Sequence, residues 1–375
     1  MSGDLVQLDV SVVLPTYNES ESLPRIIPRI VAALRGAGLS PEVIVVDDNS
    51  PDGTAEVARG LASEHPVRTI HRTTERGLAT AVLAGFAASE ATVCVVMDAD
   101  GSHPVEALGE MVRVVRDGHA DIAVGSRHVP GGGSRDWPLI SRVKSRLAAL
   151  PTRALTHLTD PTSGFMAVRR TLLDRLALDP VGWKIVLEVV VKAHPARVVE
   201  VPIVFADREA GVSKQSLRVA LQYARHLEKL YAHRYPTLVE FARFCTVGLI
   251  GMAVDLTTVA ALKETLALDT RVCAVGGFAV AVTSNYAINR RWTFPGAHHV
   301  SLVRSYPIYV GANLAGFGVR LLTVHILIEF LALDHGYGYL ITNFTGILLG
   351  TLFNYAGAKF VAFRRARASL RPPPM

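Results

Sequence analysis

Short apolar runs alternate with longer amphipathic segments over roughly the first 240 residues of the chain. The apolar runs are rich in β-branched residues and too short for helices, so they predict buried strands, while the segments between them have helical spacing. The predicted strands are 10–14, 42–46, 67–71, 91–97 and 120–125, and the predicted helices are 22–34, 54–64, 78–88 and 104–116. Strands that alternate with helices imply an α/β fold with a parallel sheet covered on both faces.

The pattern changes after the first half, where apolar residues dominate. Four apolar segments, at about 244–262, 272–288, 306–330 and 339–360, each approach the roughly 20 residues that span a bilayer. Before them, 216–233 reads as a basic amphipathic helix suited to a membrane surface, or else as an ordinary surface helix. We therefore predict an α/β domain over 1–215, an interfacial helix region over 216–242, and an all-α transmembrane domain of four helices over 243–375.

Composition and charge fit this division. Half of the 375 residues are hydrophobic and the mean hydropathy is +0.30, which is too apolar for an ordinary soluble protein. The net charge of +6 gathers near the apolar segments, which suits an anionic membrane face and not nucleic acid. Basic residues are concentrated on one side of the segments, while the loops on the other side are short and carry few, so the positive-inside rule predicts an integral membrane protein with both termini and the α/β domain in the cytoplasm.

Polar residues follow several of the predicted strands, and ligands of such sheets bind beyond the carboxyl ends of the strands. The most informative are Asp98 and Asp100, which end the apolar run 91–97. Two aspartates separated by one residue at a strand end can ligate one Mg²⁺ or Mn²⁺ ion, and such an ion can hold a diphosphate. The alternative is a solvated turn, because Asp, Gly and Ser are turn residues.

Three motifs give the α/β domain a family resemblance over about residues 10–215. They are Leu14-Pro-Thr-Tyr-Asn-Glu19, Val46-Asp-Asp-Asn-Ser-Pro-Asp-Gly-Thr54 and Met97-Asp-Ala-Asp-Gly-Ser-His-Pro104, and they resemble family 2 glycosyltransferases with a GT-A fold. Together with Asp160-Pro-Thr-Ser-Gly-Phe165 and Asp207-Arg-Glu-Ala-Gly-Val-Ser-Lys214, they are similar to the dolichyl/polyprenyl-phosphate mannose synthases. The apolar half, with Arg243-Phe-Cys-Thr-Val-Gly248 and Asn289-Arg-Arg-Trp-Thr-Phe294, resembles the GtrA-like membrane domain.

This resemblance implies roles for individual residues. The nucleotide-sugar positions are Pro15, Tyr17, Glu19, Asp47, Asp48, Asp98, Ala99, Asp100, Arg208 and Lys214. The metal positions are Asp98, Asp100 and Ser102, where Ser102 stands in place of a glutamine common in mannose synthases. The acceptor-phosphate positions are Arg127, Arg142 and Ser145, and the catalytic positions are Asp100 and Arg127.

Some of these residues have simpler alternatives. Tyr17 could pack in the core, Asp47 could only tie its loop down, and His103 is better explained as a structural hydrogen-bonding residue than as a metal ligand. For the acceptor phosphate, Ser141 occupies the position where the family has arginine, and Arg142 lies beside it.

The function that the resemblance implies is transfer of mannose from GDP-mannose to polyprenyl (dolichyl) phosphate at the bilayer, with inversion and with Mg²⁺ or Mn²⁺ as cofactor. One alternative is a transferase that uses UDP-glucose or another hexose donor. The other is a flippase for lipid-linked sugars or a partner-binding membrane module. No Walker loop or GxGxxG motif is present, which argues against an NTPase or a dinucleotide enzyme.

Overall fold

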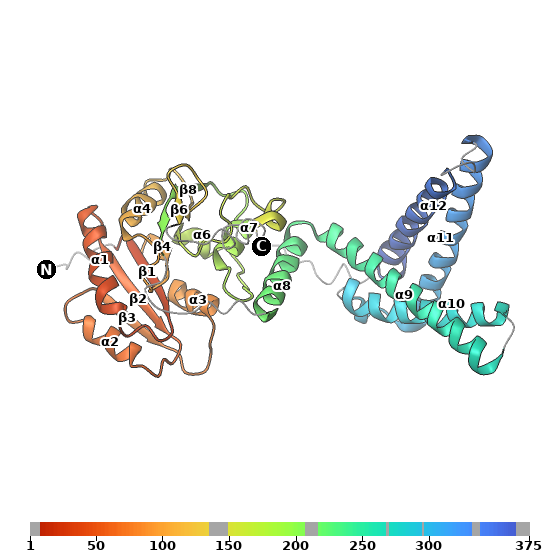
Figure 1. Cartoon of the computed structure of the whole chain (residues 1–375), viewed down its shortest axis with the longest axis horizontal. Helices are drawn as coiled ribbons and strands as arrows, with labels where there is room; N and C mark the ends of the chain where they lie inside the picture. Colours follow the sequence, from red (N-terminus) through yellow and green to blue (C-terminus); the bar gives the residue numbers. More distant parts are fainter. Residues whose placement is uncertain are drawn as a thin grey trace. The chain divides into compact units, whose positions relative to one another are not determined.

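The computed structural model describes residues 8–134, 149–206, 217–267, 270–294, 296–331 and 338–364, and the chain divides into two units between Arg234 and Tyr235 (Figure 1). The first unit is built on a seven-stranded sheet of order β3-β2-β1-β4-β7-β5-β8. Its strands are β1 (Val10–Thr16), β2 (Pro41–Asp47), β3 (Val67–His71), β4 (Val93–Val96), β5 (Ile122–Ser126), β7 (Met166–Arg169) and β8 (Val198–Pro202). A separate two-stranded sheet pairs β6 (Gly133–Ser134) with β9 (Val204–Phe205).

All five predicted strands are present, but the prediction of a parallel sheet needs a correction. Strand β7 runs antiparallel between β4 and β5, while the other pairs in the large sheet are parallel. The reason is the loop 160–165, which lies at the carboxyl edge of the parallel strands, so the strand that follows it runs back toward the amino edge. Strand β7 was not predicted, because its four residues are too few to show an alternation of polar and apolar side chains.

Helices cover both faces of the large sheet because successive strand residues point to opposite sides. Val12 contributes to a core with α1 (Leu23–Gly36) and α4 (Leu108–Arg116), whereas Val13 contributes to a core with α3 (Leu78–Ala88) and α7 (Ile185–Lys192). The helices of this unit are α1 (Leu23–Gly36), α2 (Thr54–Leu61), α3 (Leu78–Ala88), α4 (Leu108–Arg116), α6 (Arg170–Leu173), α7 (Ile185–Lys192) and α8 (Leu217–Arg234). The loops that follow β1, β2, β4 and β5 therefore meet at one edge of the sheet.

Helix α8 coincides with the predicted basic amphipathic helix. Its Leu230 is 1% exposed and joins Leu187 and Val191 of α7 in a small apolar cluster, so part of its apolar face packs within the first unit. Leu221, on the same helix, is exposed. A membrane-surface role for α8 remains a prediction.

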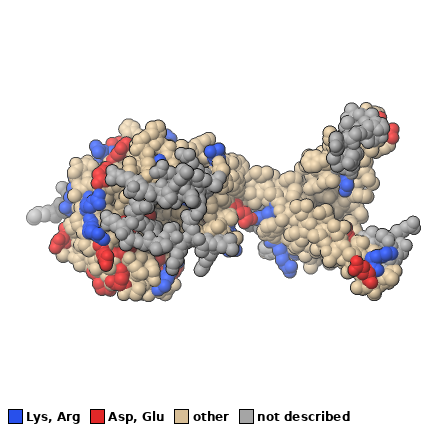
Figure 2. Space-filling model, in the orientation of Figure 1, with Lys and Arg blue, Asp and Glu red and all other residues tan. Residues whose placement is uncertain are grey.

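Four long helices make up most of the second unit: α9 (Pro236–Leu266), α10 (Thr270–Ile288), α11 (Leu302–Leu331) and α12 (Gly338–Ala356). Each contains most or all of one predicted apolar segment. Among the described residues, α9 and α11 are long and apolar enough to cross a membrane. Much of the visible surface of this unit carries no charge (Figure 2), and many of its large apolar side chains are exposed, such as Leu249, Val275 and Phe344. This exposure suits contact with lipid.

The second unit also contains an internal repeat. The ends of α10 and α12 share the sequence Asn-Tyr-Ala, starting at Asn285 and Asn354, and both helices continue into π-helical segments, η3 (Asn289–Thr293) and η5 (Gly357–Ala362). In each copy a basic residue four positions after the tyrosine donates to its hydroxyl group: Arg290 to Tyr286 at 2.8 Å and Lys359 to Tyr355 at 2.6 Å.

The two copies also contact one another in matching ways. The Tyr286 hydroxyl lies 2.6 Å from Ser305 Oγ at the start of α11, and the Tyr355 hydroxyl donates to Glu240 Oε1, 2.7 Å away, near the start of α9. Each tyrosine also stacks on the phenylalanine that ends the other copy, as Tyr286–Phe363 and Phe294–Tyr355, at interplanar angles of 28° and 27°. The two helical hairpins are therefore copies of one arrangement, joined at an aromatic core.

Candidate active site

The two predicted metal-binding aspartates follow β4, whose four residues are fully or almost fully buried. His103 Nε2 lies 3.3 Å from Asp98 Oδ2, and the imidazole is 3% exposed between the rings of Phe165 and Phe205. The imidazole thus holds the first carboxylate in position, which agrees with a hydrogen-bonding role for His103.

The second carboxylate is fixed by its own turn. Ser102 donates to Asp100 Oδ1 from its backbone nitrogen at 3.0 Å and from its hydroxyl group at 2.6 Å. Gly101 between them has a φ of +77°, which favours glycine. In this structure Ser102 therefore orients Asp100, and direct ligation of a metal by its hydroxyl group remains a prediction. The neighbouring Ala99 is buried.

The two carboxylates of this turn suit a divalent cation whose remaining ligands come from a substrate and from water. Within the described ranges no group of three or more His, Cys, Asp or Glu side chains is arranged to hold a metal on its own. Magnesium usually takes only one or two protein carboxylates and completes its shell with phosphates and water. The pair Asp98 and Asp100 matches that pattern, and does not match an all-protein cage.

The loops after β1 and β2 are joined by hydrogen bonds that explain the motif 47–54. Three of its side chains accept backbone N–H groups of the β1 loop. These bonds are Asn18 N to Ser50 Oγ at 3.0 Å, Glu19 N to Thr54 Oγ1 at 2.9 Å, and Ser20 N to Asp52 Oδ2 at 3.0 Å. Much of the motif thus shapes the loop that carries Tyr17 and Glu19, directly after Pro15 in β1.

Two predicted nucleotide residues also hold loops in this structure. Asp47 is fully buried and accepts from Ser50, and it lies 3.0 Å from His71 Nδ1, as its loop-tying alternative requires. Asp48 accepts from Arg72 Nε at 2.7 Å and from the backbone nitrogen of Gly77 at 2.7 Å. Direct contacts of either aspartate with a nucleotide remain predictions.

Tyr17 is placed differently from these aspartates. Its side chain is 51% exposed, so core packing does not explain it. The guanidinium of Arg76 lies 5.8 Å from the centre of its ring. An exposed ring beside a cation at the carboxyl edge of β1 is suited to stacking on a planar ligand.

Arg127 follows β5 and forms a two-point ion pair with Asp160. Arg127 Nε lies 2.6 Å from Asp160 Oδ2 and Nη2 lies 2.8 Å from Oδ1, while Nη2 also donates to Thr162 Oγ1 at 2.8 Å. Burial acts to raise the pKa of Asp160, but the hydrogen bonds and charge of Arg127 outweigh it and lower the pKa below its ordinary value. Sequence reasoning quoted Asp160 within a motif but did not identify this partner.

The loop 160–165 brings this ion pair close to the predicted metal site. A Cβ atom at Gly164 would lie 3.6 Å from both Asp98 Oδ2 and His103 Nε2. In the sheet, β4 lies between β1 and β7, with β5 beyond β7. The loops after β1 and β2, which carry predicted nucleotide residues, are therefore on one side of the two aspartates, and Arg127 is on the other. The predicted residues Arg142, Ser145, Arg208 and Lys214 lie outside the described residues.

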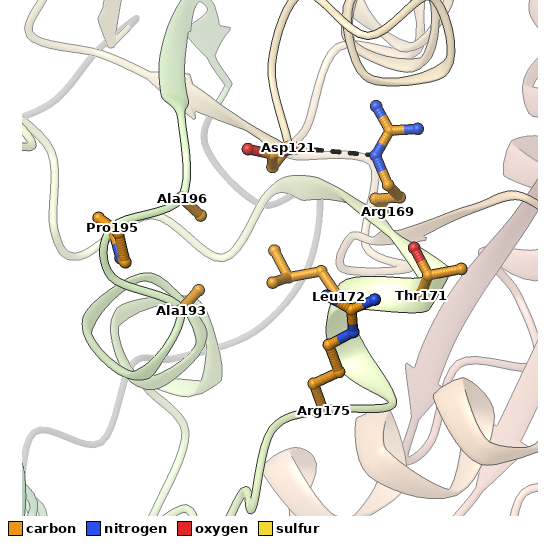
Figure 3. A pocket seen from close by; sticks show the side chains of 8 residues that line it. All are labelled: Asp121, Arg169, Thr171, Leu172, Arg175, Ala193, Pro195 and Ala196. Atoms are coloured by element: carbon orange, nitrogen blue, oxygen red, sulfur yellow. Dashed lines mark ion pairs between the residues drawn. The ribbon is translucent and has the colours of Figure 1, made fainter.

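A pocket at the opposite edge of the sheet is separate from this site (Figure 3). It is lined by Asp121, which precedes β5, and by Arg169, which ends the antiparallel β7, together with residues of α6 and the segment after α7. Arg169 pairs with Val93 at the start of β4, so the pocket lies at the amino edge, away from Asp98 and Asp100.

Comparisons with known proteins match both units. Residues 11–178 match the family described as Glycosyl transferase family 2, and residues 243–363 match GtrA/DPMS, transmembrane domain. A dolichol-phosphate mannosyltransferase of Pyrococcus furiosus is 36% identical over 346 residues, which cover 91% of this chain and 96% of that protein. A polyprenol monophosphomannose synthase of Mycolicibacterium smegmatis is 42% identical over 217 residues, 55% of this chain and 80% of that protein.

Among solved structures, a mannosyltransferase of Pyrobaculum calidifontis in complex with GDP-Man and Mn²⁺ is 19% identical, with 93% of this chain and 88% of that chain covered. Its TM-score is 0.44, and at that value the likeness supports no inference about ligands. The sequence relatives and the two family matches carry the assignment. The chain is a membrane glycosyltransferase that belongs to family 2, in the dolichol-phosphate mannosyltransferase group with a GtrA/DPMS transmembrane domain.

Proposed function

We propose that this enzyme transfers mannose from GDP-mannose to a polyprenyl phosphate such as dolichyl phosphate, with inversion at the anomeric carbon. The observation that carries the proposal is the similarity to the Pyrococcus furiosus dolichol-phosphate mannosyltransferase, which extends over 91% of this chain and so includes both units. A Micrococcus luteus relative, 41% identical, is an undecaprenyl-phosphate mannosyltransferase. The names of these relatives thus share the transferred sugar, mannose, and a polyprenyl-phosphate acceptor, but they differ in which polyprenol the acceptor contains.

The donor binds where the loops after β1 and β2 meet. Tyr17 packs against the nucleotide base, and the hydrogen bonds of Ser50, Asp52 and Thr54 keep its loop in place. Asp98 and Asp100 are the residues that would hold Mg²⁺ or Mn²⁺. When bound, such an ion neutralises the charge that develops on the leaving nucleotide.

The acceptor phosphate is an anion at neutral pH, so it attacks without the help of a strong general base. Arg127, held in place by Asp160, attracts this phosphate to the β5 side of the two aspartates. Orientation of two bound reactants removes much of the entropic barrier. A single in-line displacement then inverts the anomeric centre and gives a β-linked product.

The reaction takes place at the cytoplasmic face of the membrane. Arg290, Arg291 and Arg304 lie between the second and third apolar segments, Lys359 lies at the end of the fourth and Arg364 follows it, so this end of the helices is expected in the cytoplasm. GDP-mannose is then supplied from the same compartment as the first unit.

Radiolabelled donors test the proposal. Membranes that contain the full chain and polyprenyl phosphate should form labelled lipid from GDP-[¹⁴C]mannose and not from UDP-[¹⁴C]glucose. Asp100→Asn should abolish the label, whereas Asp117→Asn, at an exposed end of α4, should not change it. Labelling by UDP-glucose alone would contradict the proposed donor, and full labelling by Asp100→Asn would contradict the proposed site.

A further inference from the structure

A buried lysine that the sequence analysis did not identify lies beside the Arg127–Asp160 pair. Lys184 immediately precedes α7, is 5% exposed, and donates from Nζ to the Thr162 carbonyl oxygen at 3.2 Å. The ring centres of Trp183 and Tyr223 lie 3.5 and 5.8 Å from its Nζ, so aromatic groups cover the amine. Thr162 connects the two cations, because its hydroxyl group accepts from Arg127 and its carbonyl from Lys184.

The charges around Lys184 do not balance within the described part of the chain. There Lys184 forms no ion pair, and the carboxylate of Asp160 is already paired with Arg127. Glu188, one turn further along α7, is paired with Lys192 and His226. Burial, followed by the charge of Arg127, holds the pKa of Lys184 well below its usual range, while Asp160 acts in the opposite direction. Lys184 and Arg127 thus both interact with the carboxylate of Asp160.

A buried amine without an ion pair among the described residues is stabilised when an anion joins it, since buried charges are stable only when paired. An amine and a guanidinium are the groups that bind phosphate most effectively in proteins. The loop that both cations contact also lies against Asp98 through Gly164. An anion at this place would therefore lie near the predicted metal site, on its β5 side and away from the nucleotide loops.

We propose that Lys184 and Arg127 together bind the phosphate of the lipid acceptor. The inference rests on the proposed function, because it assigns the acceptor half of the same site. The donor diphosphate has the same chemistry, but the loops that receive the donor are those of β1 and β2, on the opposite side of β4.

Two substitutions separate charge from loop anchoring. Lys184→Gln keeps a donor for the Thr162 carbonyl and removes the charge, whereas Lys184→Arg keeps the charge. Loss of one charged hydrogen bond predicts a rise of about tenfold or more in the KM for polyprenyl phosphate in Lys184→Gln, with the KM for GDP-mannose nearly unchanged. Lys184→Arg should retain most of the affinity, and Lys192→Gln, at the far end of α7, serves as the control.

A binding measurement without donor makes the test independent of the transfer reaction. The full chain in detergent is titrated with a short-chain polyprenyl phosphate, and Lys184→Gln should bind it about tenfold more weakly than the wild type. Equal affinity, or a change confined to the KM for GDP-mannose, would overturn the inference. If the wild type binds the lipid phosphate but transfers no mannose, the proposed function fails while the binding comparison still decides the role of Lys184.

Discussion

Asp160 and Arg127 form a buried pair whose loss should affect both stability and activity. Asp160→Asn leaves the guanidinium without its charge partner, and breaking such a pair costs about 3–5 kcal/mol. The control is Asp174→Asn, which breaks an exposed pair with Arg170 and should cost less than about 1 kcal/mol. Chemical unfolding and mannose transfer are measured on both variants. Equal losses of stability and of activity in Asp160→Asn and Asp174→Asn would contradict this account.

At the scale of single residues, a functional side chain could be predicted from the sequence where a charged residue interrupts an apolar run. Asp98 and Asp100 stand out because two charges end an apolar run. Lys184 gave no such signal, since it lies within a short apolar stretch and its importance comes from Thr162 and Arg127, which are distant in sequence. The partners of Asp47 and Asp48 were likewise hidden, because His71 and Arg72 belong to the next strand and its loop.

Helices α7 and α8 are joined by Glu188, and this contact has a defined pH dependence. Burial acts to raise the pKa of Glu188, but bonds from His226, Lys192 and the backbone of Asp179 outweigh it and lower the pKa to about 2. A lowered pKa means that the charged form stabilises the folded state fully above the ordinary value of 4.5, and that this stabilisation is lost as the pH falls toward 2.

Glu188→Gln should therefore be less stable than the wild type at pH 7, and the difference should shrink as the pH falls below about 4.5. Thermal unfolding of the full chain in detergent at pH 7, 5 and 3 measures this trend. Glu110→Gln, on the exposed face of α4, is the control and should show no trend. A difference between wild type and Glu188→Gln that grows with acidity would show that the carboxylate is not held in its charged form.

At the scale of elements, periodicity predicted well the strands and helices that obey it. The strand 67–71 and the helix 78–88 have the predicted bounds. Strand β7 was missed because four buried residues after a loop have no distinctive period. Its direction depends on the path of the chain at the carboxyl edge, which local sequence does not encode.

For the whole molecule, the repeat in the second unit predicts which contacts join its two copies. Lys359 is 6% exposed and contacts both Glu240 and Tyr355, so Lys359→Met leaves a partly buried carboxylate unpaired and should cost roughly 2 kcal/mol. Adding Glu240→Gln should recover part of the loss, whereas Lys263→Met, at the exposed end of α9, should have little effect. Thermal unfolding in detergent measures all three, and an additive double variant would show that the pair is not coupled.

The division into an α/β unit and an apolar helical unit was predictable from hydropathy alone. The repeat was also present in the sequence, as Asn-Tyr-Ala followed by a basic residue and phenylalanine in both copies. It was missed because apolar helices look alike by composition, and only the matched contacts of Tyr286 and Tyr355 reveal that the two hairpins are equivalent.

The central claim is that Asp98 and Asp100 hold a divalent cation that mannose transfer requires. The most direct measurement is formation of polyprenyl-phosphate mannose by the purified full chain in lipid vesicles, after removal of divalent ions with EDTA and again after addition of Mn²⁺ or Mg²⁺. We predict no product without the ion and recovery when it is restored, with no recovery in Asp100→Asn. Undiminished transfer by the ion-free enzyme would contradict the account.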